Sequence, residues 1–430
     1  METVKLGLMG LGTVGSGVIE GLGKNYSLIK EKSGLDFDVK KIMVKDKQKK
    51  RAIQVEESKL VTDPKEILED DEIDIVVELI GGCDEAKDYV IQALKSGKDV
   101  VTANKDLIAT HGKEIFKTAK DSGSQVYFEG SVAGGIPLIK PLQESLAADK
   151  IEKVIGILNG TTNYILTKMT DVGYSFDRAL EEAQTYGFCE ADPTNDISGL
   201  DAAYKLAILS YLGFETLPEM EEVYCGGIEN VSQRDIQYAK KLGMEIKLLG
   251  IGEHNGKGVF LAVVPCMIPA EHPIASVKGE NNALFVRGNL VGEVMFYGPG
   301  AGSLPTGSAV LSDIIKAGKE KYKEAQIELD PILEENKYTI TPREEFEASF
   351  YLRLVVRDKP GVFSEIAGVF GSFNVSLESI IQEKREDEEY AEIVLLTHKT
   401  KIKNLDDAIA DLEKRENVSE LSNVIQVEKS

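Results

Sequence analysis

The sequence has few cysteines, and none of them stands at a spacing typical of a metal site or a redox pair. The four cysteines form no C-x-x-C pair, and no histidine lies at zinc-finger distance from them. This favours free thiols in a reducing compartment. Cys189 lacks a nearby histidine to activate it, so we do not assign it as a nucleophile. The four residues are Cys83, Cys189, Cys225 and Cys266.

Long apolar runs and an excess of cations are also absent. No stretch reaches about 18 apolar residues, and the chain enters an apolar strand without the leader of an exported protein. We therefore expect a cytoplasmic protein that does not contact a membrane. Acidic residues outnumber basic ones by 72 to 50, giving a formal net charge of −22, which excludes nucleic acid as a partner. The length of 430 residues allows two to four well-packed domains.

The first residues predict a dinucleotide-binding unit. An apolar strand, Val4–Met9, runs into G-L-G-T-V-G between Gly10 and Gly15, and an amphipathic helix follows. This is G-x-G-x-x-G in the strand, turn and helix setting that it requires. Gly10 permits the turn, Gly12 lets the backbone approach a pyrophosphate, and Gly15 allows close packing. A plain turn between a strand and a helix is the alternative.

The end of the second strand bears on the choice of cofactor. The strand Phe37–Val44 ends at Lys45 and Asp46, and further cations follow closely. An acid at this place suits the ribose 2′-hydroxyl of NAD, whereas cations suit the 2′-phosphate of NADP. We favour NADP(H), with NAD(H) as the alternative. A solvated basic surface would explain the same residues without a ligand.

Three further strands place polar residues at the carboxyl edge of the predicted parallel sheet. Ile73–Ile80 is an almost continuous apolar run, Asp99–Ala103 delivers the sequence T-A-N-K, and Val126–Phe128 precedes a glycine-rich loop. Ligands bind at this edge of open α/β sheets. Lys105 is therefore a candidate for catalysis or cofactor binding, although a surface lysine at a helix start fits equally.

The loop after Glu129 reads E-G-S-V-A-G-G-I-P. Such a loop can present several carbonyl groups to one point, and together with the Glu129 carboxylate they could hold a hard monovalent cation. A tight structural turn explains the glycines equally well.

The stretch from Ala183 to Lys205 carries the densest group of acids. Asp192-Pro193 predicts a turn, and Asp196 then stands as the N-cap of a helix over about Ile197–Leu212. On that helix Asp201 and Lys205 are four residues apart and share one face. An ordinary capped helix with a surface salt bridge is the simplest interpretation.

Glu190 adds a further acid just before this helix. Several carboxylates beside one buried lysine indicate a site for a substrate with an amino group, where the lysine can hold a proton near a reacting oxygen.

The remaining sequence predicts a second domain with a mixed or antiparallel sheet and then a smaller module. Asn255-Gly256 is a strong hairpin signal between two strands, and a glycine-rich turn over Gly298–Ser303 precedes a helix over about Thr306–Ala317. The charged segment Glu320–Glu347 is predicted to be a linker. Beyond it, a β-α-β-β-α-β pattern indicates a separable module with ferredoxin-like topology.

These motifs resemble a known family. The stretch from Ala183 to Lys205 resembles the signature of homoserine dehydrogenases, and G-x-G-x-x-G, T-A-N-K, the loop after Glu129 and G-P-G-A-G support it in the family's order. The likeness covers about the first 320 residues, and the C-terminal module is similar to ACT domains. It implies an α/β fold with a Rossmann-type doubly wound sheet, a second α+β domain and a ferredoxin-like ACT domain.

The domain boundaries that we expect follow from this resemblance. Residues 1–135 would form the dinucleotide-binding domain and residues 136–303 the substrate-binding and dimerisation domain. Residues 304–320 would be a helix that returns to the first domain, residues 321–347 a linker, and residues 348–430 the ACT regulatory domain.

The resemblance also implies an activity and a set of site residues. The reaction would be the reversible NAD(P)H-dependent reduction of L-aspartate 4-semialdehyde to L-homoserine, in threonine and methionine biosynthesis. Lys205 would donate the proton and Lys105 would contact nicotinamide and substrate, while Glu190, Asp196 and Asp201 would hold the substrate. The cofactor would contact Gly10, Gly12, Thr13, Val14, Gly15, Lys45, Ala103, Lys105, Gly187 and Gly302. A sodium or potassium ion would bind Glu129 and the carbonyls of Val132, Gly134 and Ile136.

One position departs from the family pattern, since Lys45 stands where members commonly carry arginine. A lysine lacks the planar fork that grips a phosphate, so selectivity for NADP is expected to be weak.

The turn Asp358–Val362 resembles the amino-acid-binding turn of ACT domains, which implies a homodimer or homotetramer inhibited by L-threonine. An ACT domain that only assembles subunits is the alternative. Two other functions remain open: another NAD(P)-dependent amino-acid dehydrogenase, and a non-catalytic amino-acid sensor with a vestigial dehydrogenase body. The presence of Lys105 and Lys205 counts against the sensor.

Overall fold

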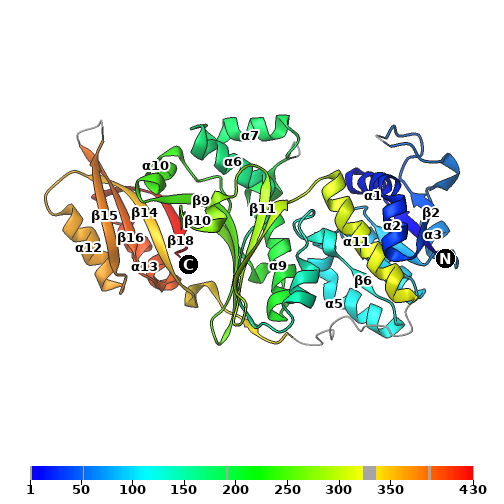
Figure 1. Ribbon diagram of the computed structural model, residues 1–430. Coiled ribbons are helices and arrows are strands. Elements are labelled where there is room, and N and C mark those ends of the chain that lie inside the picture. The colour runs from blue at the N-terminus through cyan, green and yellow to red at the C-terminus, as the bar shows by residue number, and fades with distance from the viewer. Residues whose placement is uncertain (1, 52, 190–191, 323–335, 386–388, 430) are drawn as a thin grey trace. The chain divides into compact units, whose positions relative to one another are not determined.

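The computed structural model describes residues 2–51, 53–189, 192–322, 336–385 and 389–429 (Figure 1). The chain divides into two compact units. Unit 1 comprises Met1–Glu152, Tyr204–Met220 and Asn282–Tyr338, and unit 2 comprises Lys153–Ala203, Glu221–Asn281 and Thr339–Ser430. Among the residues described, no helix is both long enough and apolar enough to cross a membrane.

Unit 1 is built on a parallel sheet of six strands in the order β3-β2-β1-β4-β5-β6. This order confirms the predicted Rossmann-type sheet. The strands β1, β4 and β5 are almost entirely buried because helices cover the sheet, as their continuous apolar sequences predict. The strands are β1 (Thr3–Met9), β2 (Asp36–Met43), β3 (Leu60–Val61), β4 (Ile75–Glu78), β5 (Asp99–Thr102) and β6 (Val126–Tyr127).

Helices α1 (Thr13–Lys24), α2 (Tyr26–Ser33) and α11 (Ser303–Lys321) bury their apolar side chains with those of β1 and β2 in one core. The start of α11 lies against α1, because Ser303 Oγ donates a hydrogen bond of 2.8 Å to the Thr13 carbonyl. A side chain at Gly17 would collide with the Ser303 carbonyl at 1.9 Å. The two helix N-termini are therefore close neighbours.

Further helices and strands also belong to unit 1. Helices α4 and α5 pack together, and α4 contacts β4 and β5. The strands β11 and β12 are neighbours joined by a short turn. These elements are α3 (Lys65–Leu68), α4 (Asp84–Lys95), α5 (Lys105–Ser122), β11 (Asn281–Gly288) and β12 (Gly292–Pro299).

Unit 2 contains a sheet in the order β7-β9-β10-β18-β14-β16-β15. Strands β9 (Met244–His254) and β10 (Gly258–Pro269) form the hairpin that Asn255-Gly256 predicts, with Gly256 at a φ of +86°. Beside them lie β7 (Ile151–Ile157) and the helices α6 (Gly160–Asp171), α7 (Phe176–Thr185) and α10 (Gln233–Lys241).

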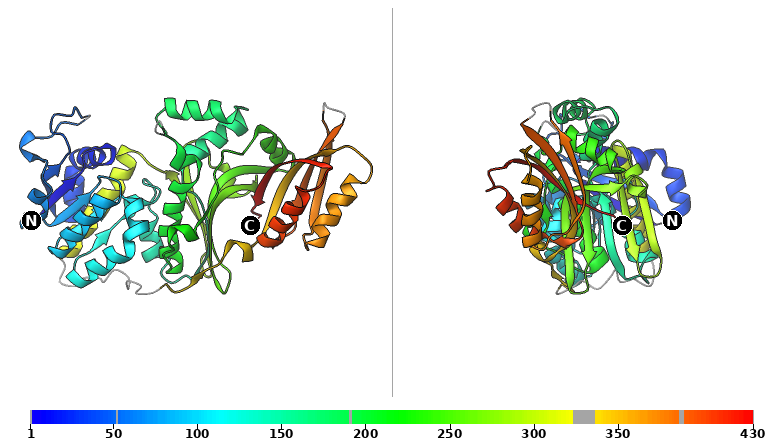
Figure 2. Two further views of the ribbon diagram at one scale, coloured as in Figure 1. Left: turned by 180° about the vertical axis from the view of Figure 1, so that it is seen from behind. Right: turned by 90° about the vertical axis from the view of Figure 1, so that its left-hand side faces the viewer.

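The C-terminal segment has the predicted ferredoxin-like topology. Its strands follow the order β18-β14-β16-β15 with antiparallel pairing throughout. Helices α12 and α13 cover one face of these strands, and their apolar residues share a core with the strands (Figures 1 and 2). The elements are β14 (Glu347–Arg357), α12 (Val362–Ser372), β15 (Leu377–Lys384), β16 (Tyr390–Thr397), α13 (Ile402–Leu412) and β18 (Val418–Val427).

The charged linker suggests a separable module, and in the structure this segment is joined to the rest of unit 2. The end of β18 pairs in parallel with β10, Cys266 opposite Gln426 and Met267 opposite Val427. In addition, the ring of Phe346 stacks on that of Phe260 with 3.6 Å between centroids. The free edge of β10 provides unpaired backbone groups, and the last residues of β18 satisfy them. One continuous sheet results.

The helix predicted over Ile197–Leu212 is also different in the structure. A short helix, α8 (Thr194–Ile197), precedes a longer helix, α9 (Leu200–Phe214), and Gly199 lies between them at a φ of +87°. This left-handed conformation interrupts the helix. Asp196 therefore lies inside α8 and is not the N-cap of the long helix, so that prediction is wrong.

Candidate functional site

Asn159 binds two of the predicted substrate acids. It follows β7 and caps α6, where its Oδ1 accepts a hydrogen bond of 2.9 Å from the Thr162 amide. Its Nδ2 donates to Asp196 Oδ1 at 2.7 Å and to Asp201 Oδ2 at 2.8 Å. A single side-chain amide thus fixes the start of α6 and the positions of both carboxylates.

The two carboxylates lie side by side. Because both bond to one nitrogen atom, Asp196 and Asp201 lie close together, and two like charges at such separation repel each other. Thr161 Oγ1 adds contacts to Asp196 Oδ2 at 3.2 Å and to the Phe188 carbonyl at 2.8 Å. A substrate ammonium group would relieve the repulsion. Glu190, the third predicted acid, lies outside the described residues.

Helix α9 carries the candidate proton donor. Lys205 stands one turn after Asp201 on the same face, and it is only 9% exposed. Ala202, Ala203 and Ala207 around it are buried. The division between the compact units falls between Ala203 and Tyr204, so Asp201 is counted in unit 2 and Lys205 in unit 1. The helix itself is continuous.

The glycine motif of unit 1 fits a dinucleotide. Gly10 has a φ of +103° and lies against the Leu79 carbonyl, and a side chain at Gly15 would stand 2.3 Å from the Gly10 carbonyl. Both glycines are thus required by the turn. A side chain at Gly12 would instead meet no atom within 4 Å, so this backbone faces open space. Gly12 is the N-cap of α1 without a side-chain cap, as a phosphate site at a helix N-terminus requires.

The remaining predicted cofactor residues lie at element ends. Thr13 and Val14 open α1, Ala103 follows β5, and Gly302 is the N-cap of α11 at a φ of +134°; all are in unit 1. Gly187 follows α7 in unit 2 at a φ of +75°.

The predicted NADP-selecting cation, Lys45, is exposed after the end of β2. The next loop is organised by Arg51, whose guanidinium donates to the carbonyls of Asp46 at 2.5 Å and Lys49 at 2.8 Å. Arg51 is thereby engaged with the backbone of its own loop.

The carboxyl edge of the parallel sheet is held by a buried polar chain. Thr102 Oγ1 donates to Glu78 Oε2 at 2.7 Å, and Asn104 Nδ2 donates to the Gly82 carbonyl at 2.7 Å. Glu78 is fully buried, and burial raises the pKa of its carboxyl group. In T-A-N-K, therefore, Thr102 and Asn104 fix the loops at this edge. Lys105 begins α5 with its side chain 30% exposed and its Nζ 3.5 Å from Asp106.

Glu129 is buried, and backbone amides stabilise it. Its carboxylate accepts hydrogen bonds from the amides of Leu138 at 2.6 Å, Ile139 at 2.9 Å and Lys140 at 2.9 Å. Its own amide donates to Asp313, whose pKa burial raises to about 6 despite the ion pair with Lys140 at 2.9 Å. These contacts explain a buried acid without a metal.

The turn that follows Glu129 buries the other predicted cation ligands, Val132, Gly134 and Ile136. Over the described part of the chain, no group of three His, Cys, Asp or Glu side chains could hold a metal ion. A cation here would depend on carbonyl oxygens.

Cys189 is a poor nucleophile. Burial, together with the nearby Asp196 charge, raises the pKa of its thiol, which disfavours the reactive thiolate. This agrees with the exclusion of Cys189 from the predicted site.

Sequence reasoning missed Asn159 and Thr161. Asn159 at the start of a predicted helix carries an ordinary N-cap signal. Its Nδ2 contacts to residues 37 and 42 positions away leave no trace in the local pattern. Glu78 was likewise hidden within an apolar strand.

Comparison with known protein families gives three matches. Residues 10–129 match the family model described as "Homoserine dehydrogenase, NAD binding domain", and residues 137–315 match "Homoserine dehydrogenase". Residues 350–417 match "ACT domain". Together they span both units.

Individual relatives agree with these matches, two of them over almost the whole length of the chain. A protein named homoserine dehydrogenase from Bacillus subtilis is 42% identical over 100% of this chain and 99% of its own. The crystal structure of a homoserine dehydrogenase from Thiobacillus denitrificans is 40% identical, with a TM-score of 0.92 over 99% of this chain and 98% of that chain. A hyperthermophilic archaeal homoserine dehydrogenase in complex with NADPH is 32% identical, with a TM-score of 0.61 over 74% of this chain and 98% of that chain.

Proposed function

This chain belongs to the homoserine dehydrogenase family of NAD(P)-dependent oxidoreductases, and from that premise we propose how its residues divide the work. The observation that carries the proposal is the pair Asp196 and Asp201 held by one Asn159 nitrogen, with Lys205 one turn further along α9. This arrangement suits a substrate that has an ammonium group and an oxygen at the reacting carbon.

Asp196 and Asp201 are proposed to bind the ammonium group of L-homoserine or L-aspartate 4-semialdehyde. Glu190, from the same signature, is proposed to join them. The ammonium compensates the repulsion between the carboxylates, and Asn159 keeps them in place before the substrate arrives. Binding at this point fixes the far end of the substrate, so its reactive carbon takes a defined position.

Lys205 is proposed to be the proton donor in the direction of reduction. When bound, the nicotinamide supplies a hydride to the aldehyde carbon. As negative charge develops on the aldehyde oxygen, the Lys205 ammonium stabilises it and transfers a proton to it, leaving a neutral amine. In the direction of oxidation the neutral amine takes the proton from the alcohol. Lys105, at the carboxyl edge of the parallel sheet, is proposed to contact nicotinamide and substrate.

NADP(H) is the proposed cofactor, with NAD(H) as a weaker alternative. The open space at Gly12 and the uncapped N-terminus of α1 fit its pyrophosphate. The proposed contacts are Gly10, Gly12, Thr13, Val14, Gly15, Lys45, Ala103, Lys105, Gly187 and Gly302. The exposed Lys45 can reach a 2′-phosphate, and the archaeal relative was solved with NADPH. A lysine here predicts modest discrimination.

A sodium or potassium ion is proposed at the loop after Glu129, bound through the Glu129 carboxylate and the carbonyls of Val132, Gly134 and Ile136. The carboxylate has about four acceptor sites. Among the described residues it accepts from three backbone amides, which leaves room for a cation. Its role would be to stabilise the turn.

Regulation by L-threonine is proposed for the ACT domain, at the Asp358–Val362 turn. A homodimer or homotetramer in the cytoplasm is proposed as the working form, because ACT domains pair between subunits. The ACT domain match supports an amino-acid effector.

The test is reduction of NADP and of NAD by the purified protein with L-homoserine, beside Lys205→Ala and Lys337→Ala. Lys337 lies outside the site and pairs with Glu215 on the surface. Wild type and Lys337→Ala should turn over, whereas Lys205→Ala should lose at least about 1000-fold in kcat. Equal rates for both variants would remove Lys205 from the mechanism. If the wild-type protein reduces neither NADP nor NAD when sodium or potassium is present, the proposed function is overturned.

A further inference from the structure

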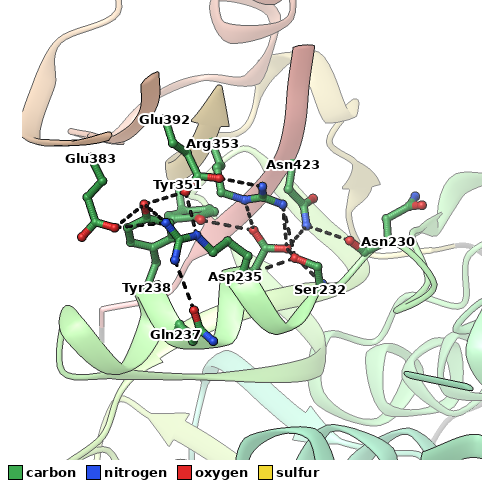
Figure 3. A network of polar contacts seen from close by, with 11 residues as sticks. Asn230, Ser232, Asp235, Gln237, Tyr238, Tyr351, Arg353, Glu383, Glu392 and Asn423 are labelled. Carbon is green, nitrogen blue, oxygen red and sulfur yellow. Dashed lines mark hydrogen bonds and ion pairs between the residues drawn. The ribbon is translucent and has the colours of Figure 1, made fainter. Parts of the chain in front are cut away.

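A buried polar network joins α10 to the sheet of the ACT domain (Figure 3). Arg353 on β14 donates through Nε to Asp235 Oδ1 at 2.9 Å and through Nη1 to Glu392 Oε1 at 3.1 Å. Arg234 on α10 donates through Nε to Glu392 Oε2 at 2.7 Å. Asp235 is fully buried and Glu392 is 3% exposed, so water does not screen these contacts.

Neutral groups complete the network. Tyr351 and Asn423 donate to Asp235 at 3.2 and 2.9 Å, and Tyr238 donates to Glu392 at 2.7 Å. Burial by itself would raise the pKa of Asp235 and of Glu392, but these donors and the arginines lower both below their ordinary values. Each acid is therefore charged, and its carboxylate oxygens accept hydrogen bonds from these groups. Removal of one partner from such a cluster would leave a buried charge without compensation, so the position of α10 on the sheet depends on all of its members.

The other side of α10 holds the C-terminal end of α6. Gln233 Nε2 donates to the Met169 carbonyl at 2.8 Å and to the Tyr174 carbonyl, and Lys240 Nζ donates to the Thr170 carbonyl. Met169 and Thr170 belong to the last turn of α6. These bonds tie α10 to this end of the helix.

Helix α6 connects this point with the substrate acids. It spans Gly160–Asp171, about 18 Å at 1.5 Å per residue. Most of its residues are buried, so it responds as a rigid element. Its first turn carries Asn159 and Thr161, which hold Asp196 and Asp201. Every member of this series lies in unit 2.

We propose that α6 couples the ACT domain to substrate binding, with Gln233 and Lys240 as the positioning residues of the link. A change in the ACT sheet displaces α10 through Arg353 and Glu392. The displacement shifts α6 along its axis, and Asn159 then holds the two substrate acids less well. The effect falls on the KM for homoserine more than on kcat. This inference rests on the proposed function, since it assigns the acids to the substrate.

The test is a double-mutant cycle on the KM for L-homoserine. One change, Glu392→Gln, weakens the network from the ACT side, and the other, Gln233→Met with Lys240→Met, cuts the link to α6. Two matched controls use the same substitutions at other positions. Glu378→Gln on β15 alters an exposed acid that pairs with Lys429, outside the network. Lys241→Met on α10 alters a lysine that pairs with Glu383 and lies over the Tyr238 ring, so it leaves the two bonds to α6 in place. Thermal unfolding of each variant identifies any loss of fold, and Tyr351→Phe replaces Glu392→Gln if that variant does not fold.

We expect Glu392→Gln to raise KM about fivefold or more with kcat within a factor of two. The same change in the link-cut protein should add less than about twofold, because the two steps lie in series. Lys241→Met should leave the effect of Glu392→Gln intact. The inference would be overturned if the two changes raised KM by independent factors that multiply in the combined variant. It would also be overturned if Glu392→Gln left KM unchanged. Failure of wild type to oxidise homoserine would instead overturn the proposed function.

Discussion

Two buried carboxylates, Glu129 in unit 1 and Asp235 in unit 2, are stabilised in different ways. Glu129 accepts from backbone amides no more than 11 residues away in the sequence. Asp235 depends on side chains of the ACT domain, of which Arg353 is 118 residues away. The first site is complete within one loop. The second exists only while two parts of the chain are docked, so it can report the state of one part to the other.

The largest effect on activity is expected when Asp196 and Asp201 lose Asn159, their partner from a distant part of the sequence. Asn159→Asp keeps the oxygen that caps α6 but replaces the amide that donates to Asp196 and Asp201 with a third negative charge. We expect kcat/KM for homoserine to fall about 100-fold or more, since hydrogen bonds to charged groups contribute about 1.5–3 kcal/mol each. Steady-state kinetics measures this.

Asn417→Asp is the matched control for that variant, because Asn417 also donates to a carboxylate, Glu365, at 2.9 Å in the ACT domain. Its kcat/KM should stay within about twofold of wild type. Similar losses in both variants would show that Asn159 has only a general structural role.

Removal of a side-chain partner should lower the free energy of unfolding by different amounts at the two buried sites. Arg353→Met leaves Asp235 buried without its cation and removes one of the two arginines that bond to Glu392, so we expect a loss of about 3–5 kcal/mol in the free energy of unfolding. Lys140→Met removes the cation beside Asp313. The loss in the free energy of unfolding should be smaller for this variant, because Asp313 can take up a proton and Glu129 keeps its hydrogen bonds from backbone amides. Urea unfolding of both variants compares them, and equal losses would contradict the distinction.

The two sites should also respond to pH with opposite sign. The pKa of Asp313 is raised from 3.8 to about 6, so the folded state binds the extra proton and stability falls as pH rises through this window, by up to about 3 kcal/mol. The pKa values of Asp235 and Glu392 are lowered from 3.8 and 4.5. Their contribution is present above those values and is lost as pH falls through the lowered ones.

Urea unfolding between pH 3 and 7 measures both trends. In Asp313→Asn the slope between about pH 4 and 6 should flatten, while the loss at lower pH remains. An unchanged slope would show that Asp313 does not titrate in that window.

The smallest effect on stability is expected at the cofactor turn. Gly12→Ala places a methyl group in open space, so the free energy of unfolding should change by less than about 0.5 kcal/mol. The same methyl group would block the pyrophosphate, and the KM for NADP should rise about tenfold or more. Gly15→Ala is the contrasting variant, since its side chain would collide with the Gly10 carbonyl. A Gly12→Ala protein with normal KM for NADP would exclude this turn as the phosphate site.

The same distinction between local and long-range contacts explains what the sequence could predict. The Rossmann-type sheet, the Asn255-Gly256 hairpin and the ferredoxin-like topology follow from periodicity and turn residues, and all three are present. The turn conformation at Gly10 was predicted for the same reason. Each depends on residues that are close together in the sequence.

The errors and omissions have the opposite origin. The capping box of α10, Ser232 with Asp235, is a local signal, but the bond from Asp235 to Arg353 is not. The pairing of β18 with β10 joins strands more than 150 residues apart, so a charged linker suggested a separate module where the sheet is continuous. The break at Gly199 was missed because the helical pattern continues on both sides of it.

The most direct test of the account is hydrogen exchange of the amides in the first turn of α6, compared between Glu392→Gln and Glu378→Gln. The measurement requires neither turnover nor an effector. If the ACT network fixes α6 and the substrate acids, exchange at these amides should accelerate in Glu392→Gln, where the buried acid is altered. It should remain at the wild-type rate in Glu378→Gln, where the altered acid is exposed and pairs with Lys429 outside the network. Equal exchange in both variants would contradict the coupling of the ACT domain to the site.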